Sequence, residues 1–119
     1  MVGALKSAEK RLEKSMEALE GKDEEELLYS LRLVTSDLEY TLFLLSLKVP
    51  NGFESTRKFG APSKHAGAGT VLALAQNLVK EALASAGLGD LLETRKKVSE
   101  ARDSLVRLQA VLERKQKEN

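Results

Sequence analysis

Apolar residues recur at every third or fourth position along most of this 119-residue chain, and this spacing constrains the fold more than any other feature. It places apolar side chains on one face of an α-helix, because an α-helix has about 3.6 residues per turn. The pattern starts at Leu5, is interrupted near Gly21, Pro50 and Gly87, and ends near Arg114. The chain is therefore predicted to be all-α, with four amphipathic helices.

The interruptions set the predicted helix boundaries. Gly21 and Gly87 are glycines, which commonly end a helix. Pro50 lacks the backbone N–H that a residue inside a helix donates. After each glycine, an aspartate is followed three positions later by a glutamate, which is the spacing of a capping box at the start of a helix. The predicted helices span about 4–20, 24–48, 66–86 and 90–115, with a loop at 49–65 and a frayed tail at 116–119.

Two short connections predict two antiparallel helical hairpins. Stacking the hairpins gives an up-and-down four-helix bundle, a single domain over 1–119, with a long loop between the second and third helices. A composition of 42% hydrophobic and 31% charged residues fits such a domain. At an offset of 64 positions the hairpins are faintly alike, for example at Val34 and Val98. Helices rich in Leu and Ala also produce such matches by chance, so the question whether the two hairpins arose by duplication stays open.

Composition excludes several classes of chemistry. The chain has no cysteine and one histidine, so cysteine-based metal sites and His-pair or His-triad centres are excluded. The formal net charge of +1 gives no overall attraction to nucleic acid or to an anionic membrane. No stretch has the length and apolarity of a membrane span, and charge appears early at the N-terminus, so a cytoplasmic protein is expected. Plentiful Glu, Lys and Arg also fit a thermophilic source.

The predicted second helix is too apolar for one side of a small bundle. One stripe of its residues has the spacing expected of the core: Leu27, Leu31, Val34, Leu38, Leu42 and Leu45. A second stripe lies on nearly the opposite face and has the same spacing: Tyr29, Leu33, Ser36, Tyr40, Phe43 and Leu47. Contiguous apolar residues on a protein surface usually mark an interface.

Two interpretations of the second stripe stay open. In the first, Tyr29, Leu33, Tyr40, Phe43 and Leu47, together with the apolar flank of the third helix, form an interface for a homodimer, a higher homo-oligomer or a protein partner. In the second, the helix is covered within its own chain, by neighbouring helices or by the long loop. The first favours a non-enzymatic interaction module or small subunit.

The long loop and the start of the third helix suggest an alternative function. Cations interleaved with aromatic rings suit contact with phosphates and unstacked bases, and free amides at a helix start attract anions. The candidate residues for RNA, single-stranded DNA or a phosphorylated ligand are Phe53, Arg57, Lys58, Phe59, Lys64, His65, Gly69 and Thr70. The simpler alternative is a loop whose phenylalanines close the end of the bundle.

Residues for enzymatic chemistry are sparse. A histidine side chain has an unperturbed pKa of about 6.5, which suits a general base, but His65 stands alone. Glu100 and Asp103 share one face of the fourth helix and would be a minimal metal site, yet basic residues lie within a turn of them and favour ion pairs. No catalytic residue, metal site or cofactor is therefore predicted, and an enzyme is the less favoured interpretation.

Overall fold

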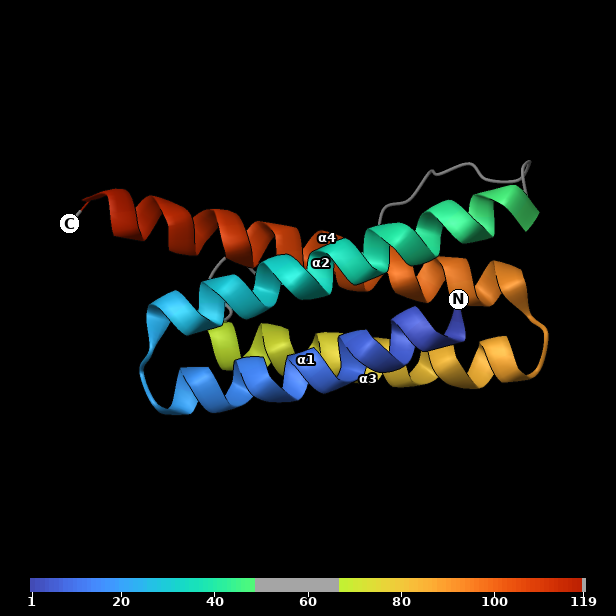
Figure 1. Cartoon of the computed structure of the whole chain (residues 1–119), viewed down its shortest axis with the longest axis horizontal. Helices are drawn as coiled ribbons and strands as arrows, with labels where there is room; N and C mark the ends of the chain where they lie inside the picture. The colour runs from blue at the N-terminus through green and yellow to red at the C-terminus, as the bar shows by residue number, and fades with distance from the viewer. Residues whose placement is uncertain (49–66, 119) are drawn as a thin grey trace.

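The structure, a computed structural model, describes residues 1–48 and 67–118, with side chains up to Lys115. Within these ranges it consists of four α-helices, α1 (Val2–Glu20), α2 (Glu24–Lys48), α3 (Ala68–Gly87) and α4 (Leu91–Glu118) (Figure 1). Helix α1 pairs with α2, and α3 pairs with α4, as two antiparallel hairpins. The predicted all-α four-helix bundle is confirmed.

The hairpins stack so that each helix has two neighbours. Helix α1 packs on α2 and α3, and α4 packs on α3 and α2, whereas in the described ranges the backbones of the diagonal pairs α1/α4 and α2/α3 do not approach each other closely. Neighbouring helices are antiparallel, so the diagonal helices α2 and α3 run in the same direction (Figure 1). Lys48 and Gly67 consequently lie at opposite ends of the bundle.

The α1–α2 turn is closed by a small set of backbone and capping bonds. The backbone N–H of Glu26 donates to Asp23 Oδ1 at 3.1 Å, so Asp23 caps α2 as predicted. The reciprocal half of the capping box is not used, because the Asp23 N–H donates to the Ala18 carbonyl at 2.9 Å. Lys22 turns the chain with a positive φ of 59°.

The α3–α4 turn repeats this arrangement 67 residues later in the chain. The N–H of Glu93 donates to Asp90 Oδ1 at 3.1 Å, and the Asp90 N–H donates to the Ser85 carbonyl at 2.9 Å. Gly89 takes the positive φ, 81°, in the place of Lys22. The two turns therefore share these capping bonds, residue for residue.

Buried positions follow the same offset of 67. In α1 they are Leu5, Ala8, Leu12, Ser15 and Ala18, and the equivalent residues of α3, also buried, are Leu72, Ala75, Val79, Ala82 and Ser85. Buried residues of α2 and α4 correspond in the same way: Leu31 with Val98, Val34 with Ala101, Leu38 with Leu105, and Leu45 with Leu112. The hairpins are thus structural equivalents at an offset of 67, and not at the 64 that Leu and Ala matches suggest.

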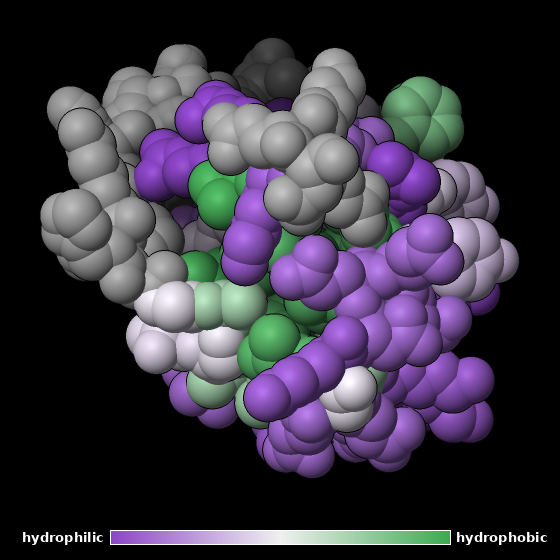
Figure 2. All heavy atoms as spheres, turned by 90° about the vertical axis from the view of Figure 1, so that its left-hand side faces the viewer, coloured by the Kyte–Doolittle hydropathy of each residue, from purple (hydrophilic) through white to green (hydrophobic). Residues whose placement is uncertain are grey.

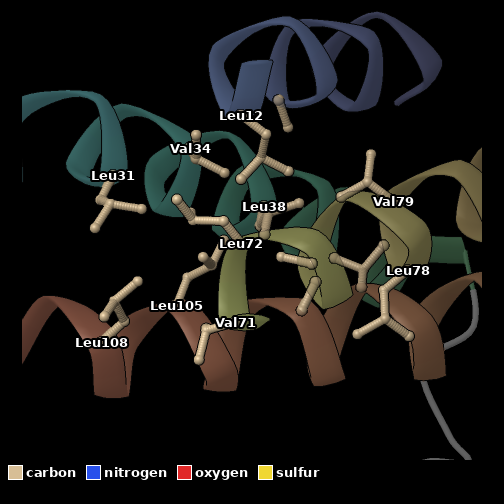
Figure 3. Packing of buried hydrophobic residues seen from close by; sticks show 14 of the residues in the cluster. Leu12, Leu31, Val34, Leu38, Val71, Leu72, Leu78, Val79, Leu105 and Leu108 are labelled. Carbon is tan, nitrogen blue, oxygen red and sulfur yellow. The ribbon is translucent and has the colours of Figure 1, made fainter. Parts of the chain in front are cut away.

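A single core lies between the four helices. Side chains from all four point to a common centre, including Leu12, Leu38, Leu72 and Leu105 (Figure 3). Burying one such leucine contributes about 1.5–3 kcal/mol, which makes this core the main source of stability. At the end of the bundle with the α1–α2 turn, apolar side chains of the interior are visible beside a group of hydrophilic side chains (Figure 2).

Candidate protein interface on helix α2

The second stripe of α2 faces away from the core. Leu31, Val34 and Leu38, in the first stripe, are completely buried, whereas the large side chains of the second stripe are more than half exposed: Tyr29 57%, Tyr40 56%, Phe43 57% and Leu47 65%. Leu33 is partly exposed. We refer to Tyr29, Leu33, Tyr40, Phe43 and Leu47 as the apolar face of α2.

The position of α2 in the bundle explains this exposure. Helix α2 lies at a corner and packs only on α1 and α4, so no other helix of the described ranges covers its outer side. The interpretation in which α2 lies centrally within its own chain therefore does not apply. The interpretation in which the long loop covers the face concerns residues 49–65, which lie outside the described ranges.

Two ion pairs border the apolar face of α2. On the α1 side, Arg11 Nη1 lies 2.9 Å from Asp37 Oδ2, and Asp37 is mostly shielded from solvent. On the α4 side, Arg32 Nη2 lies 3.0 Å from Glu113 Oε2. These contacts direct the charges of Asp37 and Arg32 toward the neighbouring helices. The result is an apolar centre with a charged rim, which is the usual anatomy of a protein interface.

Helix α4 provides an internal comparison, because its outer face is the structural equivalent of the apolar face of α2. At the offset of 67, Tyr29 corresponds to Lys96, Leu33 to Glu100, Tyr40 to Arg107 and Leu47 to Arg114; Phe43 corresponds to Ala110. Four of these five α4 residues are charged. The same position in the same fold is therefore compatible with a charged surface, so packing of the bundle does not require large apolar residues there.

The apolar flank predicted for the third helix lies mainly in the core. Val71, Leu72, Leu78 and Val79 of α3 are buried, while Leu74 is 40% exposed. Because α2 and α3 lie diagonally, the apolar face of α2 does not continue onto α3. Within the described ranges, the exposed aromatic side chains lie on α2, whereas α4 exposes the aliphatic residues Leu92, Val106 and Val111.

Of the residues predicted to bind an anion, the structure describes only Gly69 and Thr70, in the first turn of α3. Gly67 caps this helix without a side-chain hydrogen bond. A Cβ placed on Gly69 would lie 3.7 Å from Leu19 Cδ2, an ordinary van der Waals distance, so the start of α3 lies against the end of α1. The other candidates lie outside the described ranges: Phe53, Arg57, Lys58, Phe59, Lys64 and His65.

Charged side chains on the other faces form ion pairs between neighbouring positions. Lys97 Nζ lies 2.9 Å from Glu81 Oε1 and 3.5 Å from Glu93 Oε2, which links α3 to α4. The hydrogen bond to Glu81 raises the pKa of Lys97, against the opposite effect of partial burial. Arg102 Nη2 lies 3.1 Å from Asp103 Oδ1. Within the described ranges, acidic and histidine side chains form no group of three that could hold a metal ion.

The chain matches no protein-family model, no curated protein and no solved structure. In the part that the structure describes, no helix has the length and apolarity needed to cross a bilayer. The surface chemistry of the bundle is therefore the basis for assigning a function.

Proposed function

We propose that this protein is a non-enzymatic helical-bundle interaction module that associates with a second copy of itself through the apolar face of α2. The observation that carries this proposal is the contrast between equivalent outer faces, apolar on α2 and charged on α4. Exposing three aromatic rings and a leucine to water is costly, and burial against another protein removes that cost.

A second copy is favoured as the occupant because the face is bordered by charges of both signs. The rim contains Asp37 on the α1 side and Arg32 on the α4 side, and each already has a partner within the chain. A strongly basic or acidic partner would therefore find little net charge to recognise. A copy of the same face offers matching apolar residues, and closed two-fold dimers are the commonest oligomers of soluble proteins.

The test is a double substitution of the face, Leu33→Glu with Tyr40→Glu. Because Glu100 already occupies the position on α4 that is equivalent to Leu33, a glutamate is compatible with the fold at this site. We expect the variant to keep its helical circular dichroism and to have the mass of a monomer, whereas the wild-type protein has the mass of a dimer. Light scattering after size-exclusion chromatography measures both.

The matched control is Arg107→Glu, which changes the charge of the equivalent outer face on α4. The control is expected to keep the dimer mass. A wild-type protein that is already monomeric would overturn the proposal. So would a double variant that is folded and still dimeric, because the interface would then lie elsewhere.

A further inference from the structure

The six residues of the outer stripe of α2 are placed symmetrically about Leu38. Tyr29 and Leu47 lie nine positions before and after it, Leu33 and Phe43 lie five positions before and after, and Ser36 and Tyr40 lie two positions before and after. Leu38 itself is buried on the opposite, core-facing side. The stripe therefore has the same spacing read in either direction along the helix.

This symmetry distinguishes two ways of pairing α2 with a second copy. In a parallel pair, each residue meets its own counterpart, so that Tyr40 faces Tyr40 and Ser36 faces Ser36. In an antiparallel pair with its two-fold axis at Leu38, Tyr40 faces Ser36 of the second copy, and Tyr29 faces Leu47 of the second copy. The antiparallel pair places large residues opposite smaller ones, which lets the side chains interdigitate at protein density.

The charges at the two ends of α2 favour the same orientation. The first turn of α2 contains Glu24, Glu25 and Glu26, and its last turn contains Lys48. Glu24 is paired with Lys115 of α4, whose Nζ lies 3.6 Å from Glu24 Oε2, so Glu25 and Glu26 carry the acidic charge of this turn. A parallel pair would bring the two acidic turns side by side, where they repel each other. An antiparallel pair places the acidic turn of each copy near Lys48 of the other and opposes the two helix dipoles.

We propose that two copies pair through α2 in an antiparallel arrangement, with a two-fold axis opposite Leu38. This inference rests on the proposed function and specifies the partner face and its register. The contact joins Tyr29 to Leu47, Leu33 to Phe43, and Ser36 to Tyr40 across the axis.

The exposed area predicts a dimer of modest strength. A large aromatic side chain that is a little over half exposed offers about 100 Å² for burial. The apolar face then buries on the order of 500 Å² per copy, or about 1,000 Å² in total, which is near the lower limit of specific interfaces. We expect a dissociation constant on the order of micromolar, and experiments need protein well above that concentration.

Disulfide trapping tests the register directly, because the natural chain has no cysteine. The probes are two single variants, Tyr29→Cys and Leu47→Cys. In the antiparallel pair, two cysteines at the same position lie about 27 Å apart along the helix, too far for a disulfide. Neither variant alone is then expected to form a covalent dimer under mild oxidation, whereas an equal mixture of the two is.

A second pair, Leu33→Cys and Phe43→Cys, repeats the test nearer the axis and covers the case in which an end of the interface tolerates substitution poorly. The control pair is Lys96→Cys and Arg114→Cys, at the equivalent positions of α4, and this mixture is expected to show no covalent dimer on a non-reducing gel. Circular dichroism and light scattering of each variant show that it is folded and dimeric before oxidation.

Each other outcome contradicts a specific part of the proposal. Covalent dimers from the single variants alone would show a parallel pair and overturn the register, while self-association through α2 would stand. A mixture that is dimeric by mass but not trapped at either cysteine pair would overturn both the register and the α2 interface. A wild-type protein that is monomeric at about 100 μM, well above the range expected for such an interface, would overturn the proposed function itself.

Discussion

Tyr40 and Arg107 occupy equivalent positions in the two hairpins, 67 residues apart, on the outward faces of α2 and α4. Both side chains are exposed, and the helices around them meet the core through equivalent buried residues such as Leu38 and Leu105. The fold therefore sets the same local environment for an aromatic phenol and for a guanidinium. The fold does not account for the difference between them, which the proposed self-association through α2 would explain.

Replacing Tyr40 by arginine, the residue at the equivalent position of α4, separates folding from association. We expect Tyr40→Arg to change the free energy of unfolding of the monomer by no more than about 0.5 kcal/mol, because the site is exposed. The same change is expected to raise the dimer dissociation constant at least about tenfold, since it removes a central aromatic contact. Sedimentation equilibrium and urea denaturation measure the two quantities. A large loss of unfolding free energy with an unchanged dimer dissociation constant would contradict the placement of Tyr40 in the dimer interface.

Truncation on the two sides of α2 is expected to have opposite consequences. Leu38→Ala removes a completely buried side chain and is expected to cost about 2–5 kcal/mol of unfolding free energy. Leu47→Ala, at a position that is 65% exposed, is expected to cost less than about 0.5 kcal/mol in the monomer but to weaken the dimer. Urea denaturation at low protein concentration tests the first effect. Equal losses for the two variants would show that the outer side of α2 is covered within the chain.

The two turns predict a matched pair of backbone effects. Gly89 has a φ of 81° and open space where a Cβ would lie, so Gly89→Ala is expected to cost about 1 kcal/mol through backbone strain alone. Lys22 has a φ of 59° at the equivalent position, so Lys22→Gly is expected to stabilise the protein by up to about 1 kcal/mol. Thermal and urea denaturation compare the variants with the wild-type protein. If both substitutions changed the unfolding free energy in the same direction, the two turns would not be equivalent.

The ion pair between Glu81 of α3 and Lys97 of α4 predicts a loss of stability at alkaline pH. The pKa of Lys97 is raised in the folded state by its hydrogen bond to Glu81, so folding favours the protonated amine. Its contribution is therefore complete below the unfolded pKa, near 10.5, and is lost as the pH rises through the higher folded value. Lys97→Met is expected to flatten this part of the stability curve by no more than about 1 kcal/mol. Lys96→Met, at the neighbouring position, is the control, and an equal effect of both variants would assign the pH dependence to general charge.

The sequence predicts the helices well because their signals are local. Periodicity and the aspartate caps place α2 at its observed bounds and place the other helices within three residues of theirs. The differences occur where local signals are weak. Helix α1 begins at Val2, α3 begins at Ala68, and α4 continues to Glu118 through a charged stretch that the sequence predicts to fray. Lys, Gln and Glu are good helix formers, which accounts for this longer last helix.

The packing of the hairpins is not predictable in the same way. The direction of α3 relative to α2 depends on packing between residues far apart in the sequence, such as Leu38 and Leu72 in the common core, and no periodic pattern encodes it. The offset of 67 is present in the repeated aspartate and glutamate caps of the two hairpins. Chance matches of Leu and Ala at 64 obscure it, because equivalent buried positions such as Val34 and Ala101 differ in residue type.

The second apolar stripe of α2 can be recognised from the sequence, because it repeats the spacing of the core stripe. Whether this stripe is exposed can be judged only from the structure. Spacing alone identifies Tyr29, Tyr40 and Phe43 as a second stripe, and it cannot decide whether another part of the chain covers them. The structure places α2 at a corner of the bundle and supplies the charged α4 face as a comparison. The basic loop that carries Arg57 and Lys58 lies outside the described ranges, and its anion-binding role stays a prediction.

The most direct test of the central claim is the mass of the wild-type protein in solution, measured by light scattering at about 100 μM in low and in high salt. Self-association through the apolar face of α2 predicts twice the chain mass of 13.0 kDa in both conditions, because an apolar interface is not weakened by screening of charges. A mass of one chain in both conditions would contradict it.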